Sequence, residues 1–145
     1  MDPSRPAAEL IELVALVVRS LSGHRDVGLT ALSTLSSLEL HGPQRIAALT
    51  AAEGTTQPAM TQMIQRLEQR ELVTVARGAD PDDARAVVAT ITRKGRAALE
   101  AQRRRSRERV GGLLSDLPEA DVQALADALA AVLPALRERL ESDRR

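Results

Sequence analysis

The sequence predicts a mostly α-helical fold of the α+β kind, a winged helix-turn-helix with a two-stranded β wing and further helices at both ends. Apolar residues recur at helical spacing through most of the chain, and the period changes to two only over residues 72–75 and 87–91. A polar turn sequence separates these two stretches, which predicts a β-hairpin. Two short helical patterns joined by a tight turn come directly before the hairpin, and that order is typical of the motif.

Three helices are expected before the tight turn. Residues 9–21 and residues 29–40 both place apolar side chains at helical spacing. Pro43 is expected in the first turn of a short third helix over residues 43–52, because proline is well tolerated at that position. Gly54 then marks the turn.

Two helices are expected after the hairpin. Thr92 is expected to cap a long arginine-rich helix that reaches about residue 117. Pro118 is expected to open a sixth helix, whose apolar residues also recur at helical spacing. Pro134 lies inside that last pattern and should kink or divide the helix, because it removes one backbone hydrogen bond.

Composition excludes several classes of protein. The 145 residues contain no Cys, so disulfides, thiol redox sensing and thiolate metal sites are absent. No stretch approaches 18 apolar residues, and the cleavage pattern of a signal peptide is missing, which favours a cytoplasmic protein. There is also no Phe, Tyr or Trp. Alanine-rich helices bury little area each, so extra burial in a subunit interface is expected.

The zero net charge conceals an asymmetry along the chain. Residues 1–54 carry four Arg against six acids, residues 55–109 carry twelve Lys or Arg against seven, and residues 110–145 carry four Arg against seven. A basic middle segment suggests a polyanionic partner, although a solvated helix face would look the same. The run of arginines over residues 103–109 is interpreted as such a face, paired with acids such as Glu100.

The fourth helix, which Thr56 is expected to cap, has two unlike faces. At about 100° per residue, Met60, Met63, Ile64 and Leu67 fall on one side. The opposite side carries Pro58, Gln62, Gln65 and Gln69, with Thr61 and Arg66 on its shoulders. Gln can pair with adenine, Arg with guanine, and Thr can meet a thymine methyl group. The face therefore predicts contact with base edges, and the alternative is a glutamine-rich face that is merely soluble.

Three pieces of sequence resemble the MarR family of bacterial transcription regulators. They are the stretch QPAMTQMIQRLE, the pair Asp83 and Arg85 in the hairpin tip, and Ile91-Thr92-x-x-Gly95 at the start of the next helix. The similarity covers roughly residues 10–140. It implies that the fourth helix enters the major groove, that Arg85 reaches the minor groove, and that Asp83 holds Arg85 in place. It also implies a homodimer formed through the terminal helices.

The sequence departs from the family pattern in three places. Glu71 stands where the family usually has Gly, so either Glu71 adopts a left-handed conformation or the helix ends differently. The wing is about two residues longer than is common in the family. The position of Arg77 therefore matches a DNA-contacting position of the family less directly than the position of Arg85 does. The aromatic residues that often line the family's ligand crevice are missing.

The leading hypothesis is a homodimeric, sequence-specific DNA-binding regulator, a repressor of a pseudo-palindromic operator, relieved by a small apolar ligand bound between the dimerisation helices and the reading head. The residues expected at DNA are Gln44, Arg45, Thr55, Thr56, Gln57, Pro58, Thr61, Gln62, Gln65, Arg66, Arg77, Asp83 and Arg85. Of these, Gln44, Arg45, Thr55 and Thr56 are expected beside the DNA backbone.

The whole chain, residues 1–145, is expected to form a single domain. Residues 28–98 are its DNA-binding core, and residues 1–23 and 99–145 are dimerisation helices. The residues expected in the subunit interface are Leu10, Val14, Val17, Leu113, Leu117, Leu125, Leu129, Val132 and Leu136.

The sequence leaves two alternatives to this hypothesis. A helical dimer that binds a ligand or a protein, and has lost sequence-specific DNA reading, would also fit the zero net charge and Glu71. An enzyme is disfavoured because no phosphate loop and no nucleophile–base pair is evident. The two histidines, His24 and His41, lack the spacing of metal ligands, so they are interpreted as loop residues and no cofactor is expected.

Overall fold

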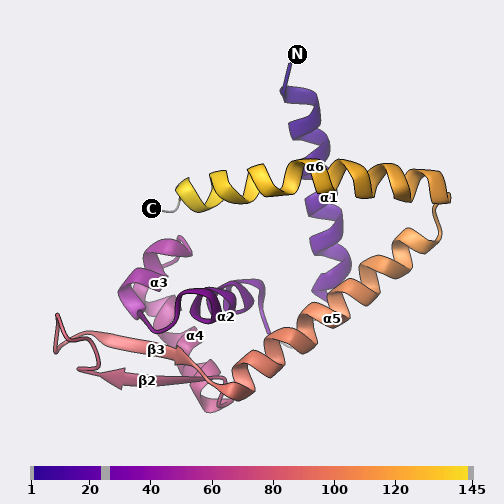
Figure 1. Ribbon diagram of the computed structural model, residues 1–145. Coiled ribbons are helices and arrows are strands. Elements are labelled where there is room, and N and C mark those ends of the chain that lie inside the picture. The colour runs from indigo at the N-terminus through magenta and orange to yellow at the C-terminus, as the bar shows by residue number, and fades with distance from the viewer. Residues whose placement is uncertain (1, 24–26, 144–145) are drawn as a thin grey trace. The chain divides into compact units, whose positions relative to one another are not determined.

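The computed structural model describes residues 2–23 and 27–143 (Figure 1). The chain divides into two compact units, Met1–Arg105 and Ser106–Arg145. The elements in chain order are α1 (Ser4–Ser22), α2 (Leu29–His41), β1 (Gln44–Arg45), α3 (Ile46–Ala52), α4 (Gln57–Gln69), β2 (Val73–Arg77), β3 (Val87–Ile91), α5 (Arg93–Ser115) and α6 (Glu119–Asp143). All six expected helices and the expected hairpin are therefore present.

The start of the third helix differs from the expectation. Pro43 precedes α3 instead of opening it, because Gln44 and Arg45 form a short strand that pairs antiparallel with Ala89 and Val88 of β3. Arg45 is extended, with φ −64° and ψ 138°, and it serves as the N-cap residue of α3. Two residues that were expected to be helical therefore satisfy their backbone groups in the sheet.

The sheet has three strands in the order β1-β3-β2, all antiparallel. The hairpin of β2 and β3 is paired from Val73 with Ile91 to Arg77 with Val87. β3 matches the predicted residues 87–91, whereas β2 begins one residue later than expected and extends two further. The third strand was missed because two residues give no alternating pattern.

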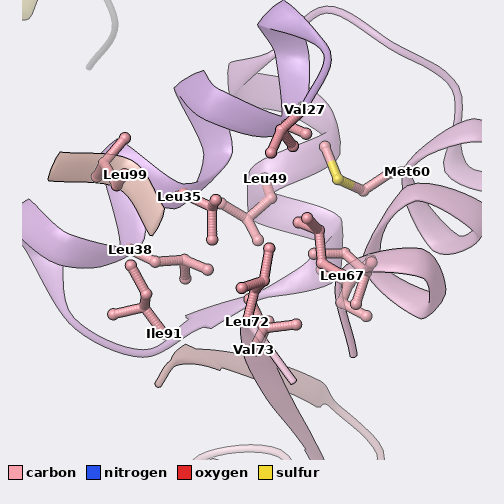
Figure 2. Close-up of a cluster of buried hydrophobic side chains, with 14 residues drawn as sticks. Val27, Leu35, Leu38, Leu49, Met60, Leu67, Leu72, Val73, Ile91 and Leu99 are labelled. Carbon is pink, nitrogen blue, oxygen red and sulfur yellow. The ribbon is translucent and has the colours of Figure 1, made fainter. Parts of the chain in front are cut away.

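The core of the first unit lies between helices α2, α3 and α4 and the inner face of the hairpin (Figure 2). Its fully buried side chains include Leu35 and Leu38 from α2, Leu49 from α3, and Met60 and Leu67 from α4. Leu and Ile side chains supply most of the apolar area, in keeping with the absence of aromatic residues. This packing fixes α4 with one side against the core and the other toward solvent.

Thr92 and Pro118 behave at the starts of their helices as the sequence predicted, whereas a division of the last helix at Pro134 is not observed. Thr92 caps α5, since its hydroxyl oxygen accepts the Gly95 N–H at 2.9 Å. The Pro118 carbonyl accepts the N–H of Asp121 at 3.0 Å, so α6 begins directly after this proline. Pro134, however, does not divide α6, which runs unbroken from residue 119 to residue 143. A single missing N–H therefore interrupts the ladder without ending a helix of 25 residues.

Candidate nucleic-acid interface

Helices α3 and α4 are joined by a tight turn over residues 53–56. The turn is closed by backbone hydrogen bonds from Gly54 to Ala51 at 3.2 Å and from Thr55 to Thr50 at 3.3 Å. Gly54 has φ 60°, a left-handed conformation that glycine adopts without strain. The predicted helix-turn-helix is therefore formed, with α4 as its second helix.

The start of α4 is built as the sequence predicted. Thr56 is extended, and its hydroxyl oxygen accepts the Ala59 N–H at 3.4 Å. Pro58 lies in the first turn, where its missing N–H costs nothing. Gln57 is the first helical residue, and its side-chain oxygen accepts the Thr50 hydroxyl at 3.5 Å. The free N–H groups of this turn and the positive end of the helix dipole suit an anion.

The two faces of α4 are arranged as the helical wheel predicted. Met60, Ile64 and Leu67 are buried, and Met63 and Thr61 are half-buried at the boundary. The exposed side carries Pro58, Gln62, Gln65, Arg66 and Gln69. Within this exposed set there is no acid, because Glu68 lies well to one side of its centre. The face therefore offers amide and guanidinium groups to whatever approaches it.

Two of these polar side chains also line a hollow of about 460 Å³ beside α4. One wall is the start of α2 with the residues just before it, from Val27 to Ala31, and the other includes Gln62, Met63 and Arg66. Arg66 donates to the Gln62 side-chain oxygen at 3.5 Å. Gln62 and Arg66, two of the residues expected to read bases, are thus neighbours on the exposed face.

The wing is the loop between β2 and β3, residues 78–86 (Figure 1). Gly78 has φ 75°, and its N–H donates to the Ala86 carbonyl at 3.1 Å. Arg77 is exposed at the end of β2, and Arg85 is exposed near the tip. The wing loop therefore carries one exposed arginine, Arg85, and a second, Arg77, lies directly before it at the end of β2.

Asp83 contacts Arg85 through the backbone. Its carboxylate accepts the Arg85 N–H at 2.9 Å, and its carbonyl accepts the Ala86 N–H at 3.0 Å. The resemblance implied that Asp83 holds Arg85 in place. In the structure Asp83 fixes the main chain of Arg85, and the guanidinium is left exposed.

An ion pair that the sequence did not indicate connects the wing to the sheet. The Arg45 Nε donates to the carboxylate of Asp80, 35 residues later in the chain. This hydrogen bond, followed by the Asp82 N–H, lowers the pKa of Asp80, and the same carboxylate raises the pKa of Arg45. The sequence Asp80-Pro81-Asp82 predicts a turn, because these residue types favour turns. The ion pair could not be predicted, because nothing in the sequence places Arg45 near Asp80.

The end of α4 resolves the question posed by Glu71. Glu71 has φ 61°, so the left-handed alternative is the one adopted. Its carbonyl accepts the Thr92 hydroxyl at 2.7 Å, and its carboxylate pairs with Lys94 at 2.5 Å. The Lys94 ammonium lowers the pKa of Glu71. A strained residue is therefore held by contacts from the first turn of α5.

The remaining expected DNA residues lie on the helix-turn-helix and its strand. Thr55 is half-buried in the turn, and Gln44 is half-buried on β1, where its side-chain amide donates to the Ser37 hydroxyl at 3.0 Å.

The arginine run on α5 contacts α2 as well as its own helix. Arg103 contacts Glu100 at 3.9 Å, as expected, but its closer partner is Glu39 of α2 at 2.8 Å. Arg103 thus joins α5 to the core of the first unit.

The residues expected in a subunit interface are mostly exposed in the single chain. Leu10, Val14, Leu113, Leu117, Leu129 and Val132 are exposed, whereas Val17, Leu125 and Leu136 are half-buried. α1 exposes further apolar side chains outside this expected set, with Ile11 at 70% exposure. Helix α1 has no buried residue at all.

His24, which was expected to be a loop residue, lies outside the described residues. His41 is the last residue of α2 rather than a loop residue, and it is exposed. Over residues 2–23 and 27–143, no helix is long and apolar enough to cross a membrane.

A tight helix-turn-helix followed directly by an antiparallel hairpin defines a winged helix-turn-helix protein. Comparison with known proteins narrows this class. A model of the MarR family matches residues 28–87. The HTH-type transcriptional repressor NicR of Pseudomonas putida is 33% identical over 110 residues, which are 76% of this chain and 64% of the repressor. The match thus spans less than two thirds of that relative.

Solved structures agree with this assignment. The transcriptional regulator Tm0710 from Thermotoga maritima is 26% identical, with a TM-score of 0.68 and a match that covers 96% of each chain. RV1404 from Mycobacterium tuberculosis is also 26% identical, with a TM-score of 0.65 over 90% of this chain and 86% of that one. Residues 28–87 thus match the MarR family, whose members are transcriptional regulators and not enzymes, and the chain is similar to such regulators over most of its length.

Proposed function

We propose that the protein is a homodimeric, cytoplasmic, sequence-specific DNA-binding regulator that represses a pseudo-palindromic operator. The observation that carries the proposal is the exposed face of α4, which presents Gln62, Gln65 and Arg66 with no acid at its centre. Amide and guanidinium groups read adenine and guanine edges, and an acid-free centre avoids repulsion by phosphate.

The flanking groups would position the DNA backbone. Thr55 and Thr56 stand beside the start of α4, where free N–H groups and the helix dipole favour a phosphate, and Gln44 would approach the backbone from β1. Arg77 and Arg85 are exposed on the wing, so they can approach the groove next to the one that α4 enters. Such contacts orient the protein on the duplex but carry no sequence information themselves.

Dimerisation is proposed through α1, the second half of α5 and α6. Leu10, Val14, Leu113, Leu117 and Val132 are exposed in the single chain, and burying apolar side chains of this kind drives association. A dimer would place two copies of α4 about one helical turn of DNA apart, roughly 34–36 Å. A small apolar effector would relieve repression only if it bound one spacing of the two reading heads better than the other.

The experiment that tests DNA reading is selection of bound duplexes from a random library at near-physiological salt. The proposal expects an enriched inverted repeat with half-sites about one turn apart. If the folded dimer enriches no sequence, the sequence-specific regulator is refuted and a module that binds a ligand or protein partner takes its place.

Point variants assign the reading residues. Gln65→Ala and Arg66→Ala should each cost about 1–3 kcal/mol of binding and relax the preference at one base position. Arg104→Ala is the matched control, because Arg104 is an exposed arginine on α5 and its loss should leave the base preference unchanged. An unaltered preference in both α4 variants would remove those residues from the interface.

A further inference from the structure

Arg45 lies on the short edge strand β1, directly opposite Val88 of the central strand β3. This pairing fixes its backbone to the base of the wing. Its Nε donates to Asp80, whose side chain is only 15% exposed although it belongs to the wing loop. A contact between residues 35 positions apart thus crosses from the helix-turn-helix to the wing.

Asp80 also accepts hydrogen bonds from other residues of the wing loop. One carboxylate oxygen accepts from Arg45, and the other accepts the Asp82 N–H at 2.9 Å. The Asp80 carbonyl accepts the Asp83 N–H at 3.3 Å, and Asp83 in turn accepts the Arg85 N–H at 2.9 Å. A continuous set of hydrogen bonds therefore runs from the Arg45 guanidinium to the main chain of Arg85.

The charges of the wing loop distinguish a structural role of Asp80 from a direct effect on DNA binding. Asp80, Asp82 and Asp83 place three carboxylates in a loop that is proposed to approach a polyanion. All three attract the Arg45 guanidinium, and Asp80 also bonds to it directly. By charge alone, removing any of these acids should strengthen binding to DNA. An acid that strengthens binding must therefore act through geometry.

We propose that Arg45 is a positioning residue that, through Asp80, holds the wing in the conformation that presents Arg85 to DNA. The inference rests on the proposed DNA-binding function and deepens it, since the sequence alone suggested only that Arg45 lies beside a phosphate. The role differs from a direct phosphate contact, because it requires Asp80 as much as it requires Arg45.

The test compares Asp80→Ala with Asp82→Ala, measured against the operator found by library selection. Both variants remove one carboxylate from the same loop, but only the first removes the contact with Arg45. Asp80→Ala and Arg45→Ala should each weaken DNA binding about tenfold, whereas Asp82→Ala should leave it unchanged or tighter. The double variant Arg45→Ala/Asp80→Ala should bind no worse than either single variant.

The phosphate-contact role makes the opposite prediction. If Arg45 acts on DNA directly, Asp80→Ala binds as tightly as the wild type or more tightly, and this result overturns the proposal. Arg85→Ala supplies a second criterion. Its effect should shrink to less than about twofold in the Asp80→Ala background, because a displaced Arg85 has little left to lose.

A measurement without DNA separates failure of this inference from failure of the proposed function. Trypsin cleavage after Arg85 should be about fivefold faster in Asp80→Ala than in Asp82→Ala, since a loosened loop opens more often. Equal cleavage rates would overturn the inference even if the wild type binds its operator. Faster cleavage with unchanged operator affinity would also overturn it, because the contact with Asp80 would then stabilise the wing loop without affecting DNA binding.

Discussion

Replacing Gly95 by Ala is the sharpest structural test, because it acts where the residues that follow α4 meet α5. A Cβ at this position would lie 2.1 Å from the Leu72 carbonyl oxygen and 2.8 Å from the Ile91 Cγ1. The Leu72 oxygen cannot move freely, since it accepts the Thr92 N–H at 3.0 Å. The methyl group must therefore push apart the residues that follow α4 and the first turn of α5.

The expected cost combines two opposing contributions. Alanine in place of glycine inside a helix gains about 1 kcal/mol of intrinsic helix stability. Overpacking against a rigid neighbour costs about 1–3 kcal/mol, and a backbone oxygen at 2.1 Å places Gly95 at the upper end of this range or beyond it. The net loss should be about 2 kcal/mol, or roughly 6 °C in Tm for a chain of this size.

Gly112→Ala is the matched control within the same helix. A Cβ at Gly112 meets nothing within 4 Å, so this variant should gain about 0.5–1 kcal/mol. Urea unfolding followed by circular dichroism, at equal protein concentration, measures both free energies. If Gly95→Ala is as stable as the wild type while Gly112→Ala is stabilised, the close approach to Leu72 is not a constraint and the reasoning fails.

Three further predictions concern buried and strained groups. Thr34→Val should stabilise the fold by about 1 kcal/mol, because the fully buried Thr34 hydroxyl has no hydrogen-bond partner in the described part of the chain; lower stability in urea would contradict this. Glu71→Gly should raise Tm by about 3 °C, since glycine adopts φ 61° without strain and the exposed pair with Lys94 contributes little. An unchanged or lower Tm would show that the contacts of Glu71 outweigh its strain. The lowered pKa of Asp80 means that its pair with Arg45 stabilises the fold above the unfolded pKa of about 3.9 and is lost as pH falls through the lower folded value. Unfolding measured from pH 7 to pH 2 should therefore show less acid sensitivity in Asp80→Ala than in the wild type, and identical profiles would exclude the pair as a contributor.

The local structure was largely readable from the sequence. Thr56 and Thr92 cap their helices as predicted, because a hydroxyl that accepts a backbone N–H three residues later is a short-range interaction. The faces of α4 followed from helical spacing, since burial against a core imposes that period. The prediction for β3 was correct in both bounds, because its run of β-branched residues, Val87, Val88, Thr90 and Ile91, favours a strand.

The local structure could not be predicted from the sequence where it depends on residues far away in the chain. Pro43 favoured an earlier helix start, but pairing with β3 took Gln44 and Arg45 into the sheet. Glu71 left two alternatives open, and contacts from Thr92 and Lys94, more than twenty residues away, decided between them. In both cases the local preference was weak, so a few long-range hydrogen bonds were enough to outweigh it.

The sequence by itself thus determined the order of the six helices and the hairpin, the polar face of α4 and the resemblance to the MarR family, because each follows from residues close together in the chain. Only the tertiary structure decided the partners of Arg45, Glu39 and Glu71, which lie between 23 and 64 residues away. Ion pairs of this kind leave no periodic pattern, and charge alone does not select one acid among twenty. The folded backbone makes that selection by bringing one carboxylate within reach of each cation.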